Sequence, residues 1–444
     1  MIDRTVEKAA LETRTTFFSD YREVEGVKLP HMVRITNGES KYDQFLSVTS
    51  VTWNVPLKDG FAAVPAAAGP DYRFAGGKTE STIPFQLINN HIYVDVTLNG
   101  KGPYALLCDT GGQNVMTPTL VKELGLESQG ALQGRGVGEK SEDVGFTMVD
   151  ALSVGDVTLD RQSFAVFALE SFGDVAGVPM HGLIGYEVFK RFVVKIDYEK
   201  NRLTLTEPAA FTYAGTGTIV PFKFDDSMPQ VEGAIDGIPG VFDIDTGSRS
   251  SLSVNGPFAE THGLKAKLNP RVTAVTGWGV GGPSRGLVAR AGELRLGTLV
   301  VKDVVTSLSL QTKGSFSSPY EAGNVGAGVL KRFNLVFEYG KQRIIFEPNA
   351  HRDTPDVFDR SGMWVNREGS ELVVVDVTAG GPAEAAGIKA GDRILHVDDR
   401  PAVEIGLVGL RNRFRSEAPG TSIRLRVLRE GAEKGVNLVL KDLV

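Results

Sequence analysis

The chain has 444 residues, a length that predicts about three domains of roughly 150 residues each. Its 48 Lys and Arg residues and 54 Asp and Glu residues give a net charge of −6, which disfavours nucleic acid or an anionic membrane as a partner. No apolar run is long enough for a transmembrane segment, and the single cysteine, Cys108, excludes an internal disulfide framework. Short strand-like stretches punctuated by 52 glycines favour a mainly β fold.

Residues 1–78 form the first predicted unit, a small N-terminal β region. The alternating stretches TRTTFFSDYREV, VKLPHMVRIT and YDQFLSVTSVTWNV resemble the last strands of bacterial lipoprotein-carrier-like β-sheet domains. Three strands with a short helix cannot close such a sheet, and open edges favour pairing. We therefore expect either that the chain lacks an upstream half, together with a signal peptide, or that the strands pack on the next domain. An envelope carrier that binds an apolar ligand is a further functional reading.

Residues 79–350 contain an internal repeat. The two copies share six landmarks in the same order, beginning with I-P-F or V-P-F and passing through Asp-Thr-Gly, a Gly-rich turn and K-R-F to a final Glu-Pro. The Asp-Thr-Gly motifs begin at Asp109 and Asp245. Two copies of one β-rich unit, residues 79–214 and 215–350, predict a pair related by a pseudo-two-fold axis. Such an axis can bring the two Asp residues together.

The paired Asp-Thr-Gly motifs resemble those of the pepsin and retropepsin superfamily of aspartic peptidases. Two carboxylates a few ångströms apart cannot both ionise easily, so they share one proton. The ionised group can then activate a water while the protonated one polarises a carbonyl. The resemblance implies a two-lobed acid-protease β-barrel pair in which Asp109 and Asp245 are catalytic. The supporting residues would be Thr110, Gly111, Thr246, Gly247 and Ser248.

Two departures from the family pattern affect the expected site. The apolar-apolar-Gly motif that packs beside each catalytic loop is Leu-Ile-Gly from Leu183, but in the second lobe it begins with Asn324. After the Asp-Thr-Gly motif, Ser248 can bond the outer carboxylate oxygen of Asp245, whereas Gly112 offers Asp109 no hydroxyl. We therefore expect Asp109 to be less supported in its ionised form, and the base is not assigned.

Gly-rich turns in both lobes favour two flaps, the retropepsin arrangement, fused here into one chain. An extended peptide would add main-chain hydrogen bonds to such flaps. The alternative is an ordinary hairpin turn without a binding role. The candidate substrate contacts are Arg135, Gly136, Val137, Trp278, Gly279 and Val280.

Residues 351–444 resemble a bacterial-type PDZ domain, an α+β fold. The stretch GGPAEAAGIKAGDRILHVDD carries the resemblance, and a helix over 404–415 and two alternating strands follow it. In PDZ domains a loop of backbone N–H groups captures a chain-terminal carboxylate. The matching loop is Ser361, Gly362, Met363 and Trp364, with Met363 where a second Gly often sits. The alternative is a purely structural module that packs on the peptidase.

These features predict an aspartic endopeptidase that hydrolyses peptide bonds in proteins or peptides, with a PDZ domain that recruits C-terminal peptides or regulates access. The alternative is a non-catalytic peptide-binding scaffold with a degenerate peptidase fold. The six His residues lack metal-ligand spacing, so we expect no metal, and the chemistry calls for no cofactor. The family resemblance implies a periplasmic or extracellular location.

Overall fold

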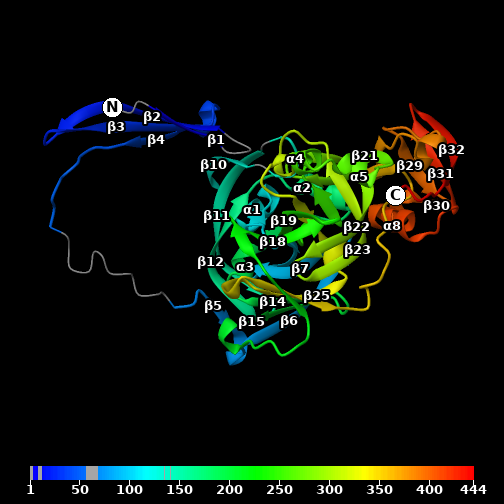
Figure 1. The fold of residues 1–444 in the computed structure, drawn as a ribbon, viewed down its shortest axis with the longest axis horizontal. Coiled ribbons are helices and arrows are strands. Elements are labelled where there is room, and N and C mark those ends of the chain that lie inside the picture. Colours follow the sequence, from blue (N-terminus) through cyan, green and yellow to red (C-terminus); the bar gives the residue numbers. More distant parts are fainter. Residues whose placement is uncertain (1–3, 9–12, 57–68, 135, 141) are drawn as a thin grey trace.

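The computed structural model describes residues 4–8, 13–56, 69–134, 136–140 and 142–444. Its N-terminal part is an antiparallel sheet in the order β1-β2-β3-β4, which lies beside the main body in Figure 1. An ion pair of 2.8 Å between Lys41 and Asp143, and a 2.9 Å bond from Asn37 Nδ2 to Gln133 Oε1, join this region to the first lobe. Its elements are β1 (Arg4–Lys8), β2 (Thr13–Val24), β3 (Val27–Thr36), the 3₁₀ turn Ser40–Tyr42 and β4 (Gln44–Ser47).

The first lobe is mainly β, with short helices between strands. Helix α1 shows how local sequence sets the element ends: Thr117 caps its N-terminus by accepting from Leu120 N at 3.2 Å, Pro118 takes its first position, and Gly125 ends it in a left-handed conformation. The lobe contains β5 (Tyr72–Phe74), 3₁₀ Ala75–Gly77, β6 (Glu80–Ile88), β7 (His91–Leu98), β8 (Lys101–Cys108), β9 (Val115–Met116), α1 (Pro118–Leu124), β10 (Gln129–Gly134), β11 (Glu142–Val154), β12 (Val157–Val166), α2 (Glu170–Ala176), β13 (Gly182–Ile184), α3 (Tyr186–Phe189), β14 (Val193–Asp197), β15 (Arg202–Thr206) and 3₁₀ Pro208–Ala210.

The second lobe follows a similar order, with helix α5 added after α4 and a 3₁₀ turn, Ser315–Ser317, in the place of α2. It contains β16 (Thr218–Pro221), β17 (Lys223–Asp225), β18 (Met228–Ile235), β19 (Ile238–Ile244), β20 (Leu252–Val254), α4 (Gly256–Thr261), α5 (Leu264–Leu268), β21 (Val272–Gly279), β22 (Gly282–Leu296), β23 (Leu299–Ser309), 3₁₀ Ser315–Ser317, β24 (Gly323–Val325), α6 (Ala327–Leu330), β25 (Phe333–Glu338), 3₁₀ Tyr339–Lys341 and β26 (Arg343–Pro348).

A shared sheet relates the two lobes. Strands β14 and β25 pair antiparallel, with Val194 opposite Phe337 and Ile196 opposite Leu335. On one side the sheet continues through β15 to β6, and on the other through β26 to β16. A pseudo-two-fold axis therefore passes between β14 and β25, and one apolar core extends through both lobes. The expectation of a mainly β, two-lobed fold is confirmed.

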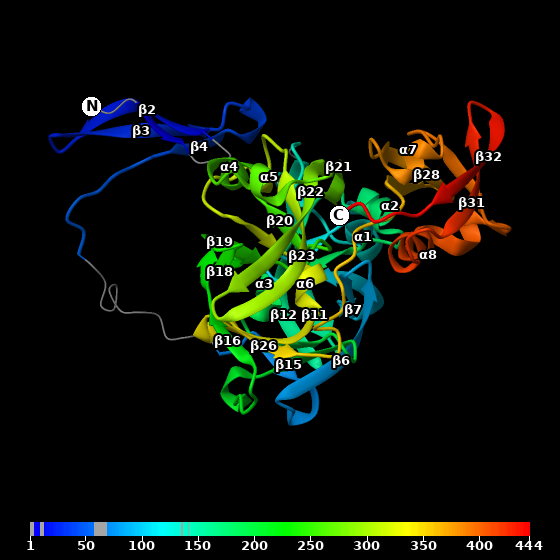
Figure 2. The ribbon, with the colours of Figure 1, turned by 45° about the vertical axis from the view of Figure 1, so that its right-hand side comes forward.

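The C-terminal domain has its own sheet, in the order β27-β28-β29-β31-β32, and its own apolar core. Strand β31 alternates buried and exposed residues as SIRLRVLR predicts, since successive side chains point to opposite faces. Figure 2 shows this domain against the side of the lobes near α2. Its elements are β27 (Met363–Glu368), β28 (Glu371–Val377), α7 (Pro382–Ala385), β29 (Arg393–Val397), β30 (Arg400–Pro401), α8 (Ala402–Ser416), β31 (Ser422–Arg429) and β32 (Ala432–Val439).

Candidate active site

Equivalent strands place the two Asp-Thr-Gly loops at the junction of the lobes. Strand β8 ends at Cys108 and β19 ends at Ile244, so each loop begins where a buried strand stops. Parallel neighbours hold the strand ends: Ile184 of β13 is in register with Cys108, and Val325 of β24 with Ile244. The Cys108 thiol is in the core, where burial raises its pKa to about 12, so it remains a neutral thiol.

The threonines of the two motifs lock the loops together in a reciprocal way. Thr110 N donates to Thr246 Oγ1 at 3.1 Å, and Thr246 N donates to Thr110 Oγ1 at 3.2 Å. Each hydroxyl in turn donates across the axis, Thr110 to the carbonyl of Ile244 at 2.7 Å and Thr246 to that of Cys108 at 2.9 Å. Both threonines are completely buried. The lock therefore fixes the position of each preceding Asp relative to the other.

The two carboxyl groups are close but have different hydrogen-bond partners. Asp109 Oδ1 accepts from Gly111 N at 3.1 Å and from Gly112 N at 2.9 Å. Asp109 Oδ2 lies so near Gly247 that a Cβ there would overlap it, which explains glycine at this position. Asp245 Oδ2 accepts from Asn324 Nδ2 at 2.8 Å, and its Oδ1 is buried without a partner in the described part of the chain.

The pKa values of both carboxyl groups are raised, but the interactions that raise and lower them differ between Asp109 and Asp245. Burial raises the pKa of Asp109, and the Gly112 and Gly111 N–H groups oppose that rise. Burial and the charge of Asp109 raise the pKa of Asp245 to about 8, against the opposing effect of Asn324. The expectation that Asp109 is the less supported carboxylate is therefore wrong. Backbone N–H groups, which motif residues do not reveal, replace the missing hydroxyl at Gly112. Among the described residues, the Ser248 hydroxyl makes no hydrogen bond to the Asp245 carboxyl group, and Asp245 Oδ1 is left without a partner.

Two polar residues beside Asp245 were not predicted as part of the site. Asn324 lies in β24, in register with Asp243 of β19, and is 6% exposed. Burial raises the pKa of Asp243 to about 7, and Gln230 Nε2 donates to its Oδ1 at 3.0 Å. The only sequence signal was the departure of Asn324 from an apolar pattern. Asn324, which in the sequence weakened the match to the family pattern, therefore supplies a hydrogen bond to Asp245.

We expect Asn324→Leu to raise the pKa of Asp245 further, because it removes the donor that favours the ionised carboxylate. A hydrogen bond to a charged group contributes about 1.5–3 kcal/mol, equivalent to a rise of about 1–2 pH units. Titration of Asp245 by carboxyl-carbon NMR measures this directly. Leu183→Met, at the equivalent position of the first lobe, is the control and should leave the pKa unchanged; an equal pKa in Asn324→Leu and the intact chain would contradict the assignment.

The two Gly-rich hairpins that were expected to be flaps contact each other. Gly138 N donates to Val280 O at 2.7 Å, and Lys140 N donates to Gly281 O at 3.3 Å. Gln311 Nε2 also donates to Val137 O at 2.7 Å. Cβ atoms built on Gly136 and Gly279 would crowd Val280 and Val137 across this contact, so glycine permits the close approach. Arg135 lies outside the described residues.

Trp278 has a different neighbour from the expected substrate. Its ring stacks on Trp364 of the C-terminal domain, with ring centroids 6.3 Å apart and planes 25° apart. An ion pair between Arg285 of β22 and Asp376 of β28 adds to this contact. The flap of the second lobe is therefore fastened to the C-terminal domain, which the sequence could not show because the two segments are far apart in the chain.

The loop expected to capture a carboxylate uses its donors internally. Asp359 Oδ1 accepts from Ser361 N at 2.8 Å, from Gly362 N at 3.3 Å and from the Ser361 hydroxyl at 2.5 Å. Met363 N donates to Ser361 Oγ at 3.2 Å. The carboxylate that meets this loop is thus the chain's own Asp359. The expectation of a free N–H cradle is corrected, because Asp359 precedes the loop and folds back onto it.

The edge strand beside this loop is also covered. Arg411 of α8 donates to the carbonyls of Val175 and Val365, and so joins the end of α2 to β27. Arg367 pairs with Asp174 at 3.3 Å. A Cβ on Gly177 would crowd Leu407 of α8. The segment Asp174–Gly177 of the first lobe therefore lies between β27 and α8, where a peptide strand would add.

Comparisons with known proteins agree with this architecture. Residues 94–188 match the family model described as aspartyl protease, and residues 358–440 match the model described as PDZ domain. The first match includes the loop of Asp109 and β13 and ends within α3, and the second extends from before the loop of Ser361 to the end of β32. No curated protein sequence matches the chain. No helix in the described part of the chain is long and apolar enough to span a membrane. The chain contains an aspartyl protease-like domain of the retropepsin-like kind, followed by a C-terminal PDZ domain.

Proposed function

We propose that this protein is an aspartic endopeptidase in which Asp109 and Asp245 activate a water for peptide-bond hydrolysis. The observation that carries the proposal is the reciprocal lock between Thr110 and Thr246, because it holds the two adjacent Asp residues in a fixed relative position at the junction of the lobes. The raised pKa of Asp245, to about 8, supports one shared proton at neutral pH. The family match supports a peptidase-type hydrolase in general terms.

The hydrogen bonds favour a division of roles between the carboxyl groups. Asp109, with two N–H donors, is the base that takes a proton from the water as its oxygen attacks the scissile carbonyl carbon. Asp245, protonated below about pH 8, gives its proton to the carbonyl oxygen. When the tetrahedral intermediate collapses, the C–N bond breaks. Asp109 then returns its proton to the leaving amine, while Asp245 recovers a proton from the collapsing hydroxyl.

The substrate we propose is an extended segment of a protein or peptide. It would lie under the flaps and bond their backbone groups, so the bonds from Gly138 to Val280 and from Lys140 to Gly281 must open first. The PDZ domain would bind C-terminal peptides along β27 after the segment Asp174–Gly177 has moved away. We therefore infer that recruitment by the PDZ domain and release from the first lobe occur together.

Cleavage of an unfolded protein, followed by mass spectrometry from acid to alkaline pH, tests the proposal. We expect the intact chain to cut the protein and Asp245→Asn to leave it uncut, since asparagine keeps the shape and loses the ionisable group. Equal cleavage by both proteins would contradict the proposal, because the activity would then belong to a contaminant or to a mechanism without Asp245. Absence of cleavage by either protein, with peptide binding retained, would favour a peptide-binding scaffold instead.

A further inference from the structure

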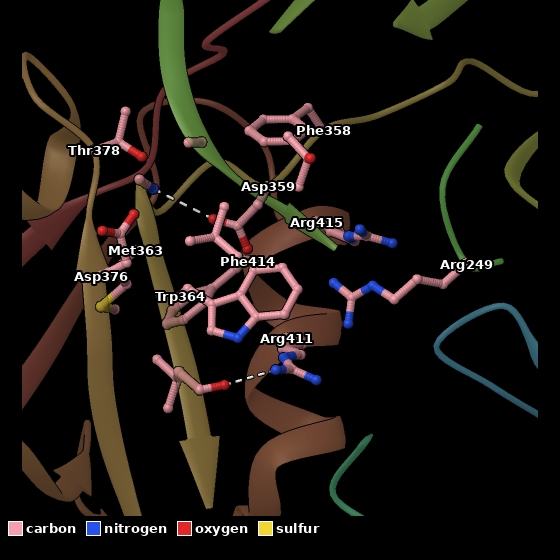
Figure 3. Close-up of a pocket in the computed structure, with 15 residues that line it drawn as sticks. Arg249, Phe358, Asp359, Met363, Trp364, Asp376, Thr378, Arg411, Phe414 and Arg415 are labelled. Carbon is pink, nitrogen blue, oxygen red and sulfur yellow. Dashed lines mark hydrogen bonds between the residues drawn. The ribbon is translucent and has the colours of Figure 1, made fainter. Parts of the chain in front are cut away.

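A small cavity lies where the PDZ domain meets the second lobe (Figure 3). Its volume of about 40 Å³ has room for about three water-sized groups. The guanidinium groups of Arg249, Arg411 and Arg415 converge on it, around the indole of Trp364. We call this set of four residues the arginine pocket. Phe358, Met363 and Phe414 supply apolar walls.

The positive charge of the arginine pocket exceeds the negative charge of the groups around it. Within the described residues, the guanidinium groups of Arg249 and Arg415 have no hydrogen bond or ion pair, and Arg249 Nε is buried without a partner. Arg411, 6% exposed, donates to the carbonyls of Val175 and Val365 and to no other group in the described part of the chain. Trp364 offers ring contacts at 4.7 Å to Arg249 and 5.1 Å to Arg411. Such contacts offset about 0.5–2 kcal/mol each, less than the cost of a buried charge.

The other nearby groups neutralise this charge in part, because Asp359 lines the pocket and its charge favours the charged forms of Arg249 and Arg411. Asp359 turns one oxygen to three donors of its own loop, and Asp376 is paired with Arg285. Burial lowers the pKa of His91, near Arg249, to about 3, and burial raises the pKa of Tyr93 to about 12, so both are neutral. Burial and the charges of Arg411 and Arg415 lower the pKa of Arg249, which reports the same imbalance.

Arg411 is buried, and Arg249 and Arg415 are partly buried. A charge removed from water without a partner is destabilising, by several kcal/mol when it is fully buried. We propose that the arginine pocket binds an oxyanion, a carboxylate or phosphate group, held by Arg249 from the peptidase and by Arg411 and Arg415 from the PDZ domain. Planar guanidinium groups bind both oxyanions in a bidentate way. This site differs from the backbone loop expected to capture a carboxylate, because Asp359 already occupies that loop.

Arg249 joins this site to the catalytic loop. It follows Ser248 directly and lies four positions after Asp245. Its backbone carbonyl accepts from Asn90 Nδ2 of the first lobe at 2.8 Å, while its side chain faces Trp364 of the PDZ domain. An anion in the pocket would therefore hold the PDZ domain, the catalytic loop and the flap contact of Trp278 in one arrangement. This effect on turnover rests on the proposed peptidase function, whereas anion binding does not.

The test is binding of inorganic phosphate to the full chain, measured by calorimetry and by the thermal unfolding midpoint at constant ionic strength. Phosphate should bind one site and raise the midpoint of the intact chain, since a ligand that binds only the folded state stabilises it. Arg249→Met and Arg415→Met should lose at least about tenfold in affinity and most of the shift. Both should fold, because each removes a charge without a partner.

Arg400→Met is the matched control, an exposed arginine of the same domain that lies outside the pocket, and it should bind like the intact chain. Absence of phosphate binding, or equal binding by Arg249→Met, would overturn the proposal. Two hexapeptides, one with a free C-terminal carboxylate and one with an amidated C-terminus, distinguish a peptide carboxylate from a free anion as the natural ligand. Competition by the free carboxylate alone assigns the site to a peptide terminus, and competition by neither assigns it to a small free anion. Because binding is read without cleavage, a chain that binds phosphate and cuts nothing would contradict only the peptidase proposal.

Discussion

Replacing Asp245 by Asn is expected to lower kcat/KM for a peptide substrate by about 100-fold to 10,000-fold, the range that acid–base groups contribute. The change removes the proton that Asp245 would give to the carbonyl oxygen. Asparagine can still accept from Asn324 Nδ2, and the threonine lock is untouched. The measurement is steady-state kinetics on a peptide identified from the mass-spectrometric cleavage sites.

The same variant should be no less stable than the intact chain at neutral pH. An unfolded Asp ionises near pH 4, whereas Asp245 has a pKa of about 8 in the folded protein. The folded chain thus binds a proton that the unfolded chain releases, so stability falls as the pH rises from about 4 to 8. Asparagine does not ionise, so this loss should be absent. Retained activity in a stable variant would remove Asp245 from the mechanism.

Replacing Thr246 by Val should lower the free energy of unfolding by about 2–6 kcal/mol. The side chain keeps its shape but loses the oxygen that accepts from Thr110 N and donates to the carbonyl of Cys108. Both groups would be left buried without a partner, at about 1–3 kcal/mol each. Denaturant unfolding measures the loss. Cleavage should also fall, because the carboxyl groups are no longer held at a fixed separation.

Thr246→Ser is the control for this prediction, because it keeps the hydroxyl and loses one methyl group. It should retain most of the stability and activity. Equal loss in the Ser and Val variants would mean that packing of the methyl group, rather than the hydrogen-bonded lock, stabilises the loops.

The repeat predicted the arrangement of the lobes because it carries long-range information within the sequence. Equal order of landmarks around Asp109 and Asp245 implied an axis, and the sheet between β14 and β25 has that axis. The C-terminal domain was predictable for a similar reason, since its Gly-Pro-Ala and Ala-Gly-Asp turns occur close together. Local motifs thus gave the domains and the expected pair of carboxyl groups.

The contacts between segments without a shared motif were not predictable. Asn324 reaches Asp245 because β24 lies parallel to β19 in one particular register. Trp278 meets Trp364 because of how the PDZ domain docks, and Asp359 meets its own loop because of a local fold-back. Each of these contacts depends on how the segments are placed in three dimensions. Residue type alone therefore did not predict the contacts of Trp278 and Asp359, and it suggested that Asn324 weakens the site when Asn324 in fact supports it.

The dependence of kcat/KM on pH tests the shared-proton mechanism most directly, with Asp243→Asn measured in parallel because Asp243 has a pKa of about 7 nearby. The value of kcat/KM should rise as Asp109 ionises and fall as Asp245 loses its proton near pH 8. The fall of kcat/KM at alkaline pH should persist in Asp243→Asn. A kcat/KM that stays constant from pH 6 to well above 8 would contradict a mechanism in which Asp245 is the proton donor. So would an alkaline fall in kcat/KM that is absent from Asp243→Asn.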